Sequence, residues 1–551
     1  MFSKGGIRNR KSGLIKGKIG IRNRKVGLVK GKIGVGNKKV GLVNGKVGLS
    51  NGKMGGRNRT SEGNYVLFFS LLLTGIIVAV GIFFPEKFNY VSTKLFNVLI
   101  DKFSPMYLLL MLGIFIFSLY LAFSKYGDIK LGKETDEPEF SNVVWFSMLF
   151  GAGMGIGLVF FGAWEPMSHF VNPLNEVGGS EGAVRFAIEQ SFIHWGVFSW
   201  VAYAVIGLSL AYFQFRKNKR GLISTTLDPI LEDNKYKNII KLVVDVLSVF
   251  ITVVGVAASM GLGTMQIGGG LQYLFGIKNT FTLQIFIILI IAVIYIYTAV
   301  GGLDNGMKQL SNINLVLATT LLLGCFLVGP TEKIMNAFVS GLGDYLNYFV
   351  SQSLFINPIT SNEWVYKWRI FYWAYWISWS PFVGVFIARI SKGRTIREFV
   401  LGVIIVPSLI CMLWFVVFGI MGMDLGFDFA KDAITYTDTS LFKVLANYRG
   451  GFLFSIIAIL LLFTFFITSA NSAIYVLGMF TSRGDLNPKN SNKIVWGIIQ
   501  ALFAIVFIML GGLDILQRFA IVVSFPFAFV LIGISVALIK ALKRDNKTRN
   551  K

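Results

Sequence analysis

Four aromatic side chains gather on one face of a predicted membrane helix at residues 368–390. Trp373, Trp376 and Trp379 recur every three residues, so a helix places them in one stripe, with Tyr375 at its edge. Tryptophan in membrane helices is enriched at the two interfaces, but this stripe runs into the middle of its segment. A cation without hydrogen-bond donors is held by the faces of aromatic rings. The stripe therefore indicates either a site for such a cation or aromatic packing between helices.

A second aromatic group lies in the apolar run at residues 192–213. Trp195, Trp200 and Tyr203 fall within about 140° of one helix face, so they can line the same site as the stripe. Core packing explains either group alone. His194 precedes Trp195, and we interpret it as a packed, neutral histidine rather than a proton carrier.

Glycine occupies every second position from Gly151 to Gly157, in the middle of the apolar run at residues 143–163. Glycines four residues apart commonly let membrane helices pack closely. Four glycines within so short a stretch also weaken a helix enough to unwind it. Unwound backbone inside a membrane survives where it lines a cavity, and there its N–H and C=O groups can bind a carboxylate or a cation. The run predicts either a close helix contact or a broken helix at a binding site.

Three hydroxyl side chains, Thr468, Ser469 and Ser472, lie in the apolar run at residues 451–482. Hydroxyl and carbonyl oxygens suit a hard cation such as Na⁺. Hydroxyls in membrane helices more often bond to the backbone of their own helix. Beside an unwound glycine run, however, they form a candidate sodium site. We interpret Glu165, near the end of a span, as a structural or interfacial acid.

The chain that must position these residues is strongly apolar: of its 551 residues, 54% are hydrophobic and 15% are charged. Runs of about twenty apolar residues are long enough to cross the hydrocarbon core as helices. The chain has two cysteines, Cys325 and Cys411, and two histidines, which argues against a disulfide framework and a His-rich metal site. We expect an all-α membrane protein with twelve transmembrane helices, near residues 65–84, 105–124, 143–163, 192–213, 239–262, 281–302, 311–329, 368–390, 399–420, 451–482, 494–512 and 518–541.

Both ends of the chain are basic. Residues 1–63 carry seventeen Lys and Arg against one acid, Glu62, and contain three glycine-rich copies of a 14-residue repeat. Dense glycine disfavours regular structure, so we expect a disordered tail at 1–63, a unit of twelve spans at 64–541 and a short basic tail at 542–551. Loops after even-numbered spans are mostly short and basic, which places both termini in the cytoplasm. The N-terminal tail either touches anionic lipids, rather than nucleic acid, or is a repeat expansion without function.

Three stretches together resemble the betaine/carnitine/choline transporter family, and the resemblance covers about residues 60–540. It rests on Trp-Ala-Tyr-Trp-Ile-Ser-Trp-Ser-Pro-Phe-Val-Gly at 373–384 with the basic segment 388–398, on Gly-Met-Gly-Ile-Gly at 153–157 followed by Glu165-Pro166, and on Trp195, Trp200 and Tyr203.

The resemblance implies the inverted-repeat fold of the leucine transporter, with spans 3–7 and 8–12 as the two repeats. It implies an aromatic box for a trimethylammonium group, a glycine turn that receives the carboxylate of the substrate, and a homotrimer. The residues implied to bind substrate are Trp195, Trp200, Tyr203 and Trp376 in the box, Trp379, Tyr375 and Trp373 beside it, and Gly153, Met154 and Gly155 in the turn.

The resemblance also implies that Na⁺ is the coupling ion, and it implies two sets of ligands. These are the carbonyls of Gly151, Met154 and Phe465 with the hydroxyls of Thr468 and Ser469 at one site, and Thr252 with Phe382 at the other.

Four positions depart from the family or divide it. Val256 offers no ligand where relatives with two sodium ions have a second Thr at this site. Tyr375 stands where Trp is usual and keeps a ring face, whereas Asn471 stands where Asp is usual and removes a negative charge near the proposed sodium. Gly157 stands where choline carriers often have Asp, which favours a zwitterion with its own carboxylate.

These residues predict a secondary active transporter that imports glycine betaine or a related trimethylammonium compound with Na⁺, for osmoprotection, across a bacterial inner membrane. No enzymatic chemistry and no organic cofactor are expected. Two alternatives stay open. Val256 is compatible with a sodium-independent exchanger of carnitine, betaine or choline, and the basic tail is compatible with a membrane sensor that binds betaine without moving it.

Overall fold

The structure is a computed structural model that describes residues 64–549 except Met154, Gly302 and Leu303, together with three strands in the N-terminal tail. The chain divides into two units, residues 1–63 and residues 64–551.

Short antiparallel strands are described within the first unit: β1 (Gly34–Val35), β2 (Lys38–Val43) and β3 (Lys46–Ser50). In the pairing of β2 with β3, Val43 lies opposite Lys46. The sequence between them is Asn44-Gly45, the dipeptide favoured in two-residue hairpins. The strands differ from the disordered tail expected above, because this turn signal and the alternating β-branched residues favour local pairing. The rest of the tail lies outside the described residues.

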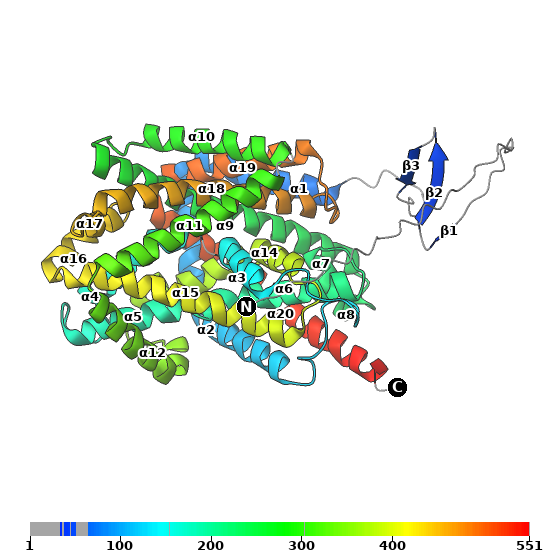
Figure 1. Cartoon of the computed structure of the whole chain (residues 1–551), viewed down its shortest axis with the longest axis horizontal. Helices are drawn as coiled ribbons and strands as arrows, with labels where there is room; N and C mark the ends of the chain where they lie inside the picture. The colour runs from blue at the N-terminus through cyan, green and yellow to red at the C-terminus, as the bar shows by residue number, and fades with distance from the viewer. Residues whose placement is uncertain are drawn as a thin grey trace, which may run out of the picture. The chain divides into compact units, whose positions relative to one another are not determined.

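The second unit is built of helices (Figure 1). Within its described residues, eleven helical segments are long and apolar enough to cross a membrane. The third expected span, at 143–163, is divided between α3 (Asn142–Gly153) and α4 (Ile156–Val171). The other helices are α1 (Tyr65–Phe83), α2 (Pro85–Phe123), α5 (Glu181–Trp195), α6 (Phe198–Ala211), η1 (Tyr212–Arg216), α7 (Ile223–Thr226), α8 (Asp228–Leu231), α9 (Lys237–Phe275), α10 (Phe281–Val300), α11 (Asp304–Val328), α12 (Thr331–Ser353), α13 (Glu363–Val365), η2 (Tyr366–Ile370), α14 (Phe371–Ile390), α15 (Ile396–Asp424), α16 (Phe427–Ala433), α17 (Ser440–Ala446), α18 (Gly451–Phe480), α19 (Asn490–Met509) and α20 (Leu513–Arg549).

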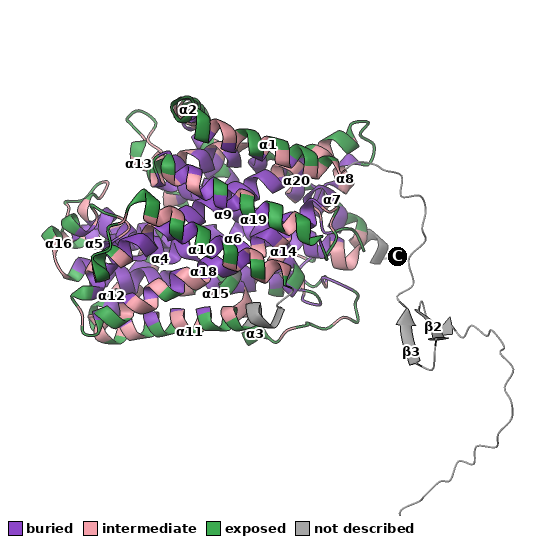
Figure 2. Ribbon diagram, turned by 90° about the horizontal axis from the view of Figure 1, so that it is seen from above, coloured by how far each residue is buried: buried purple, intermediate pink, exposed green. Residues whose placement is uncertain are grey.

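The helices that carry the predicted site residues lie inside this bundle. α6 packs along α14, and α9 packs along α18. Residues 187–213 and 368–390 are almost completely buried, whereas α1 has only four buried residues. Figure 2 shows the same division, with buried residues in the interior and exposed residues along α1, α2 and α11. The lipid-facing sides of these helices are expected to be apolar, because lipid tails offer no hydrogen-bond partner to polar groups.

α6 and α14 approach each other closely at two glycines. A Cβ added to Gly207 would lie 3.2 Å from the carbonyl oxygen of Gly384, and a Cβ added to Gly384 would lie 2.6 Å from Cγ2 of Ile206. Small residues at helix crossings allow such an approach of the two backbones. This contact therefore sets the spacing between the aromatic residues of α6 and those of α14.

Gly384→Val is expected to lower stability by about 1–3 kcal/mol, because extra methyl groups in a close contact force the helices apart. The measurement is the apparent Tm of the purified protein in detergent. Gly343→Val is the matched control, since a Cβ at Gly343 meets no atom within 4 Å. Equal Tm values for the two variants would contradict the close contact.

Candidate functional site

The first half of the site comes from α5 and α6, which the hydropathy pattern presents as one span. α5 ends at Trp195, because Gly196 leaves the helical conformation with ψ −137°. A Cβ at Gly196 would lie 2.7 Å from the methyl group of Met412, so the turn itself is tightly packed. α6 follows directly and carries Trp200 and Tyr203.

The second half comes from α14, and the two halves meet as an aromatic box formed by Trp195, Trp200, Tyr203 and Trp376. The ring centroids of Trp195 and Trp376 are 4.9 Å apart at 78°, and those of Tyr203 and Trp376 are 6.3 Å apart at 88°. Trp200 meets Tyr203 at 5.8 Å and 83°. All four rings are buried, with at most 2% of their surface exposed. Nearly perpendicular walls of this kind present ring faces from several directions.

α9 fixes the neighbouring rings of the stripe. The indole N–H of Trp379 donates to the carbonyl oxygen of Gly255 at 3.0 Å, and the hydroxyl of Tyr375 bonds the hydroxyl of Ser259 at 2.5 Å. Tyr375 lies 5.2 Å from Trp376, ring centroid to ring centroid. The structure therefore brings Tyr375 and Trp379 next to the box.

Trp373 is placed differently. Its ring packs 4.6 Å from the ring of Phe198 and meets His194 edge-on at 6.3 Å. It belongs to the stripe on α14, but its recorded ring contacts are with these two side chains rather than with the four rings of the box.

The glycine run breaks its helix beside these rings. Gly155 has φ −153° and ψ −142° between α3 and α4, so the predicted interruption is present. A Cβ at Gly155 would lie 3.6 Å from the hydroxyl of Ser469 on α18, and one at Gly157 would lie 3.2 Å from the ring of Trp195. Gly151 is exposed in α3, and Gly153 is the last residue of that helix. Met154 lies outside the described residues.

The candidate sodium ligands on α18 are engaged with protein groups. The Thr468 hydroxyl lies 3.1 Å from the carbonyl oxygens of Thr464 and Phe465, and it accepts a hydrogen bond from the Asn314 amide at 3.0 Å. Ser469 is half-buried. Hydroxyl and carbonyl oxygens, the two types expected for Na⁺, therefore lie together on α18. The amide of Asn314 lies beside them, and the sequence patterns did not identify it.

The candidates for the second sodium site lie on α9 and α14. The Thr252 hydroxyl donates to the carbonyl oxygen of Ser248 at 2.7 Å, in its own helix. Phe382 packs 5.7 Å from Trp379, ring centroid to ring centroid, and Val256 is buried.

Asn471 has a role other than the one expected from its position in the motif. Its amide donates to the Thr298 hydroxyl at 2.8 Å and to the Tyr295 carbonyl oxygen at 3.3 Å, so it joins α18 to α10. The contacts recorded for this side chain are to α10 and not to the proposed sodium ligands.

Sequence inspection singled out His194 and Glu165 without linking them to the box, and it missed Ser259 and Gly255. The indole N–H of Trp376 donates to the carbonyl oxygen of His194 at 3.0 Å, and that of Trp195 donates to the carboxylate of Glu165 at 2.8 Å. Ser259 and Gly255 serve the neighbouring rings. A polar residue in an apolar span was the available signal for Glu165 and Ser259, but a backbone carbonyl such as that of Gly255 leaves no mark in the sequence.

A membrane bundle in which an interrupted helix borders a buried cluster of aromatic rings matches the architecture of secondary transporters, which typically form their substrate sites from discontinuous helices. The sequence agrees: residues 65–547 match the profile of the family described as BCCT, betaine/carnitine/choline family transporter. The chain belongs to this family of multi-pass membrane transporters, which are not enzymes.

Three relatives align with most of the chain. The "Glycine betaine transporter OpuD" of Bacillus subtilis (strain 168) is 46% identical over 491 residues, 88% of this chain and 95% of that protein. The "Ectoine/hydroxyectoine transporter" of Virgibacillus pantothenticus is 42% identical over 89% of this chain and 98% of its own length. The "Probable glycine betaine transporter" of Desulfitobacterium hafniense (strain Y51) is 41% identical over 88% of this chain and 98% of its own length.

Proposed function

We propose that this protein is a sodium-coupled carrier that imports glycine betaine into a bacterial cell as an osmoprotectant. The observation that carries the proposal is the aromatic box. The trimethylammonium group of betaine has no hydrogen-bond donor and is attracted by ring faces. The names of two relatives support the same substrate.

The glycine break supports a zwitterion over a simple cation. Betaine carries a carboxylate, and the N–H groups of unwound backbone can receive it close to the box. Gly157 faces Trp195 and the Tyr375 hydroxyl without bringing a charge of its own. Choline lacks a carboxylate, so a site for choline would gain more from an acidic side chain at this position.

Sodium is proposed to bind between the broken helix and α18. The hydroxyls of Thr468 and Ser469 and the carbonyl of Phe465 would be ligands, with the backbone of Gly151 and Met154 completing the site. A Cβ added to Gly155 would lie 3.6 Å from the Ser469 hydroxyl, so the broken helix and α18 lie close enough for both to contact one ion. The second candidate site has Thr252 and Phe382, but Val256 supplies no hydroxyl ligand there. The missing ligand favours a single bound sodium ion, and sodium-independent exchange remains the competing mechanism.

The remaining features of the proposal concern the whole molecule. Spans 3–7 and 8–12 would form inverted repeats that rock about the box, and three copies would form a homotrimer in the bacterial inner membrane. Both termini would be cytoplasmic, with the basic tail 1–63 and the short tail 542–551 near anionic lipids and the carrier unit at 64–541. A sensor that binds betaine without transporting it is the competing class of function.

Uptake of radiolabelled glycine betaine into proteoliposomes tests the proposal directly. Concentrative uptake is expected with an inward Na⁺ gradient and is expected to vanish when K⁺ replaces Na⁺. Uptake that ignores Na⁺ but requires internal betaine or carnitine would establish an exchanger. Saturable binding of betaine without accumulation would establish a sensor. Preferential uptake of ectoine would show that ectoine, and not glycine betaine, is the substrate.

Trp376→Leu is expected to raise the KM for betaine about tenfold or more, because it removes a ring face worth about 1–2 kcal/mol to a desolvated cation. Initial uptake rates at saturating Na⁺ measure the change. Trp376→Phe keeps a ring and should give a smaller increase. Trp373→Leu is the matched change one turn away on α14, and a KM equal to that of Trp376→Leu would refute the special role of the box.

Thr468→Ala is expected to raise the Na⁺ concentration for half-maximal uptake about fivefold, the effect of losing about 1 kcal/mol at one ligand. Uptake is measured over a series of Na⁺ concentrations with betaine saturating. Thr464→Ala is the control, because the Thr464 hydroxyl bonds the Leu460 carbonyl one turn earlier on α18. An unchanged Na⁺ dependence in Thr468→Ala would remove this hydroxyl from the ion site.

A further inference from the structure

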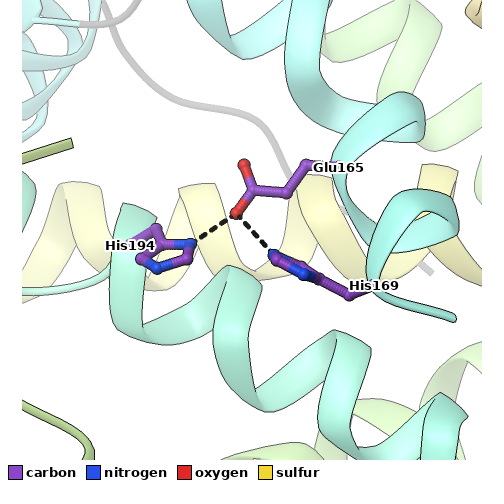
Figure 3. A group of neighbouring side chains, drawn as sticks. All are labelled: Glu165, His169 and His194. Atoms are coloured by element: carbon purple, nitrogen blue, oxygen red, sulfur yellow. Dashed lines mark hydrogen bonds and ion pairs between the residues drawn. The ribbon is translucent and has the colours of Figure 1, made fainter. Parts of the chain in front are cut away.

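A buried carboxylate lies directly behind the aromatic box. Glu165 on α4 is 0% exposed, and its Oε2 accepts hydrogen bonds from the Trp195 indole at 2.8 Å and from the Tyr372 hydroxyl. Its Oε1 accepts a hydrogen bond from Nδ1 of His194 at 2.7 Å. Figure 3 shows Glu165 with His194 and with His169, whose Nε2 is 3.6 Å from the same Oε1. Donors thus converge on both oxygens, which is the arrangement that a buried anion requires.

A buried arginine lies on the other side of His194. Arg369 in η2 is 0% exposed, and its Nε–H donates to Nε2 of His194 at 3.4 Å. Its other nitrogens donate to the side chain of Gln190 and to the carbonyl oxygen of Gln352 at the end of α12. Because Nε2 of His194 accepts, Nδ1 carries the proton and donates to Glu165. A neutral imidazole therefore joins the anion to the cation.

A metal ion is the alternative occupant of this cluster. The nearest ligand atoms of Glu165, His169 and His194 lie within 4.8 Å of one another. Both ring nitrogens of His169 lack a hydrogen-bond partner among the described residues. Coordination through Nδ1 of His194 would move the proton to Nε2, where it would face the N–H of Arg369. It would also place a second cation beside that buried guanidinium. The recorded bonds therefore favour the hydrogen-bonded arrangement.

The two rings held by Glu165 both contact Trp376. Trp195 meets Trp376 edge-on at 4.9 Å, and Tyr372 stacks on it at 5.9 Å with an angle of 19° between the ring planes. One carboxylate oxygen thus fixes the orientation of two rings around a wall of the box. Without that acceptor the buried indole N–H and phenol O–H would be unpaired, and rotation of either ring toward another acceptor would open the box.

We propose that Glu165 is a positioning residue for substrate binding, and that it aims Trp195 and Tyr372 while His194 and Arg369 hold it in place. The inference rests on the proposed function, since it assumes that the box binds the trimethylammonium group. Glu165 acts through the rings and makes no contact with the substrate in this scheme. A carboxylate is suited to the task because it accepts at both oxygens, whereas an amide accepts at only one.

Glu165→Gln tests the proposal, because it keeps the shape but turns one acceptor into a donor that faces either the indole or the imidazole. We expect the KM for betaine to rise about tenfold with a much smaller change in maximal rate. Asp245→Asn is the matched control, since Asp245 is a buried carboxyl on α9 that accepts hydrogen bonds from the backbone N–H and the hydroxyl of Ser224. Equal KM values in the two variants, or an unchanged KM in Glu165→Gln, would overturn the proposal.

Tyr372→Phe provides a second test if Glu165→Gln fails to insert into the membrane. It removes one donor to Glu165 and keeps the ring that stacks on Trp376, so a KM increase of about threefold is expected with normal protein levels. An unchanged KM would overturn the role of this bond.

A spectroscopic readout separates this inference from the proposed function. The indole N–H resonance of Trp195, assigned with Trp195→Phe in ¹⁵N-tryptophan-labelled protein, should move in Glu165→Gln and stay in place in Asp245→Asn. If the Trp195 resonance moves in Glu165→Gln but the unsubstituted protein does not take up betaine, the proposed function is wrong while the Glu165–Trp195 bond is established. Betaine uptake together with an unmoved resonance would sink the positioning role alone.

Discussion

The close approach of α6 to α14 is the contact on which the rest of the site depends. Gly207 and Gly384 let the two backbones meet, and a side chain at either position would separate the helices. Trp200 and Tyr203 are carried by one helix and Trp376 by the other, so the dimensions of the box follow from this crossing. The aromatic rings form the box, and the two glycines set the distance between the helices that carry these rings.

Hydrogen bonds within the protein then fix the orientation of three rings in and beside the box. The indole N–H groups of Trp195, Trp376 and Trp379 are donated to Glu165 and to the backbone carbonyls of His194 and Gly255. The polar edges of these three rings are therefore held by protein acceptors. Ring faces attract cations without requiring a hydrogen-bond donor, which is why the box supports the proposal of a quaternary ammonium substrate.

The interrupted helix connects the aromatic box to α18. Gly157 lies against Trp195, whereas two residues earlier Gly155 lies toward Ser469. A single stretch of backbone thus borders both the box and the hydroxyls proposed to bind sodium. Movement of that stretch would change both sites together, which is the physical requirement for coupling an ion to a substrate.

The sequence by itself determined the class of protein, the apolar spans, the break in the third span and the two aromatic groups from which the box is formed. Hydropathy, glycine spacing and helical periodicity are properties of a single segment, so they can be read from the sequence. Tertiary structure decided the rest. The stripe contains Trp373 as regularly as Trp376, yet Trp373 packs on Phe198. Asn471 bonds α10, and Glu165 holds Trp195. Which partner a polar group finds depends on helices distant in the chain, and that pairing is absent from the pattern of any one span.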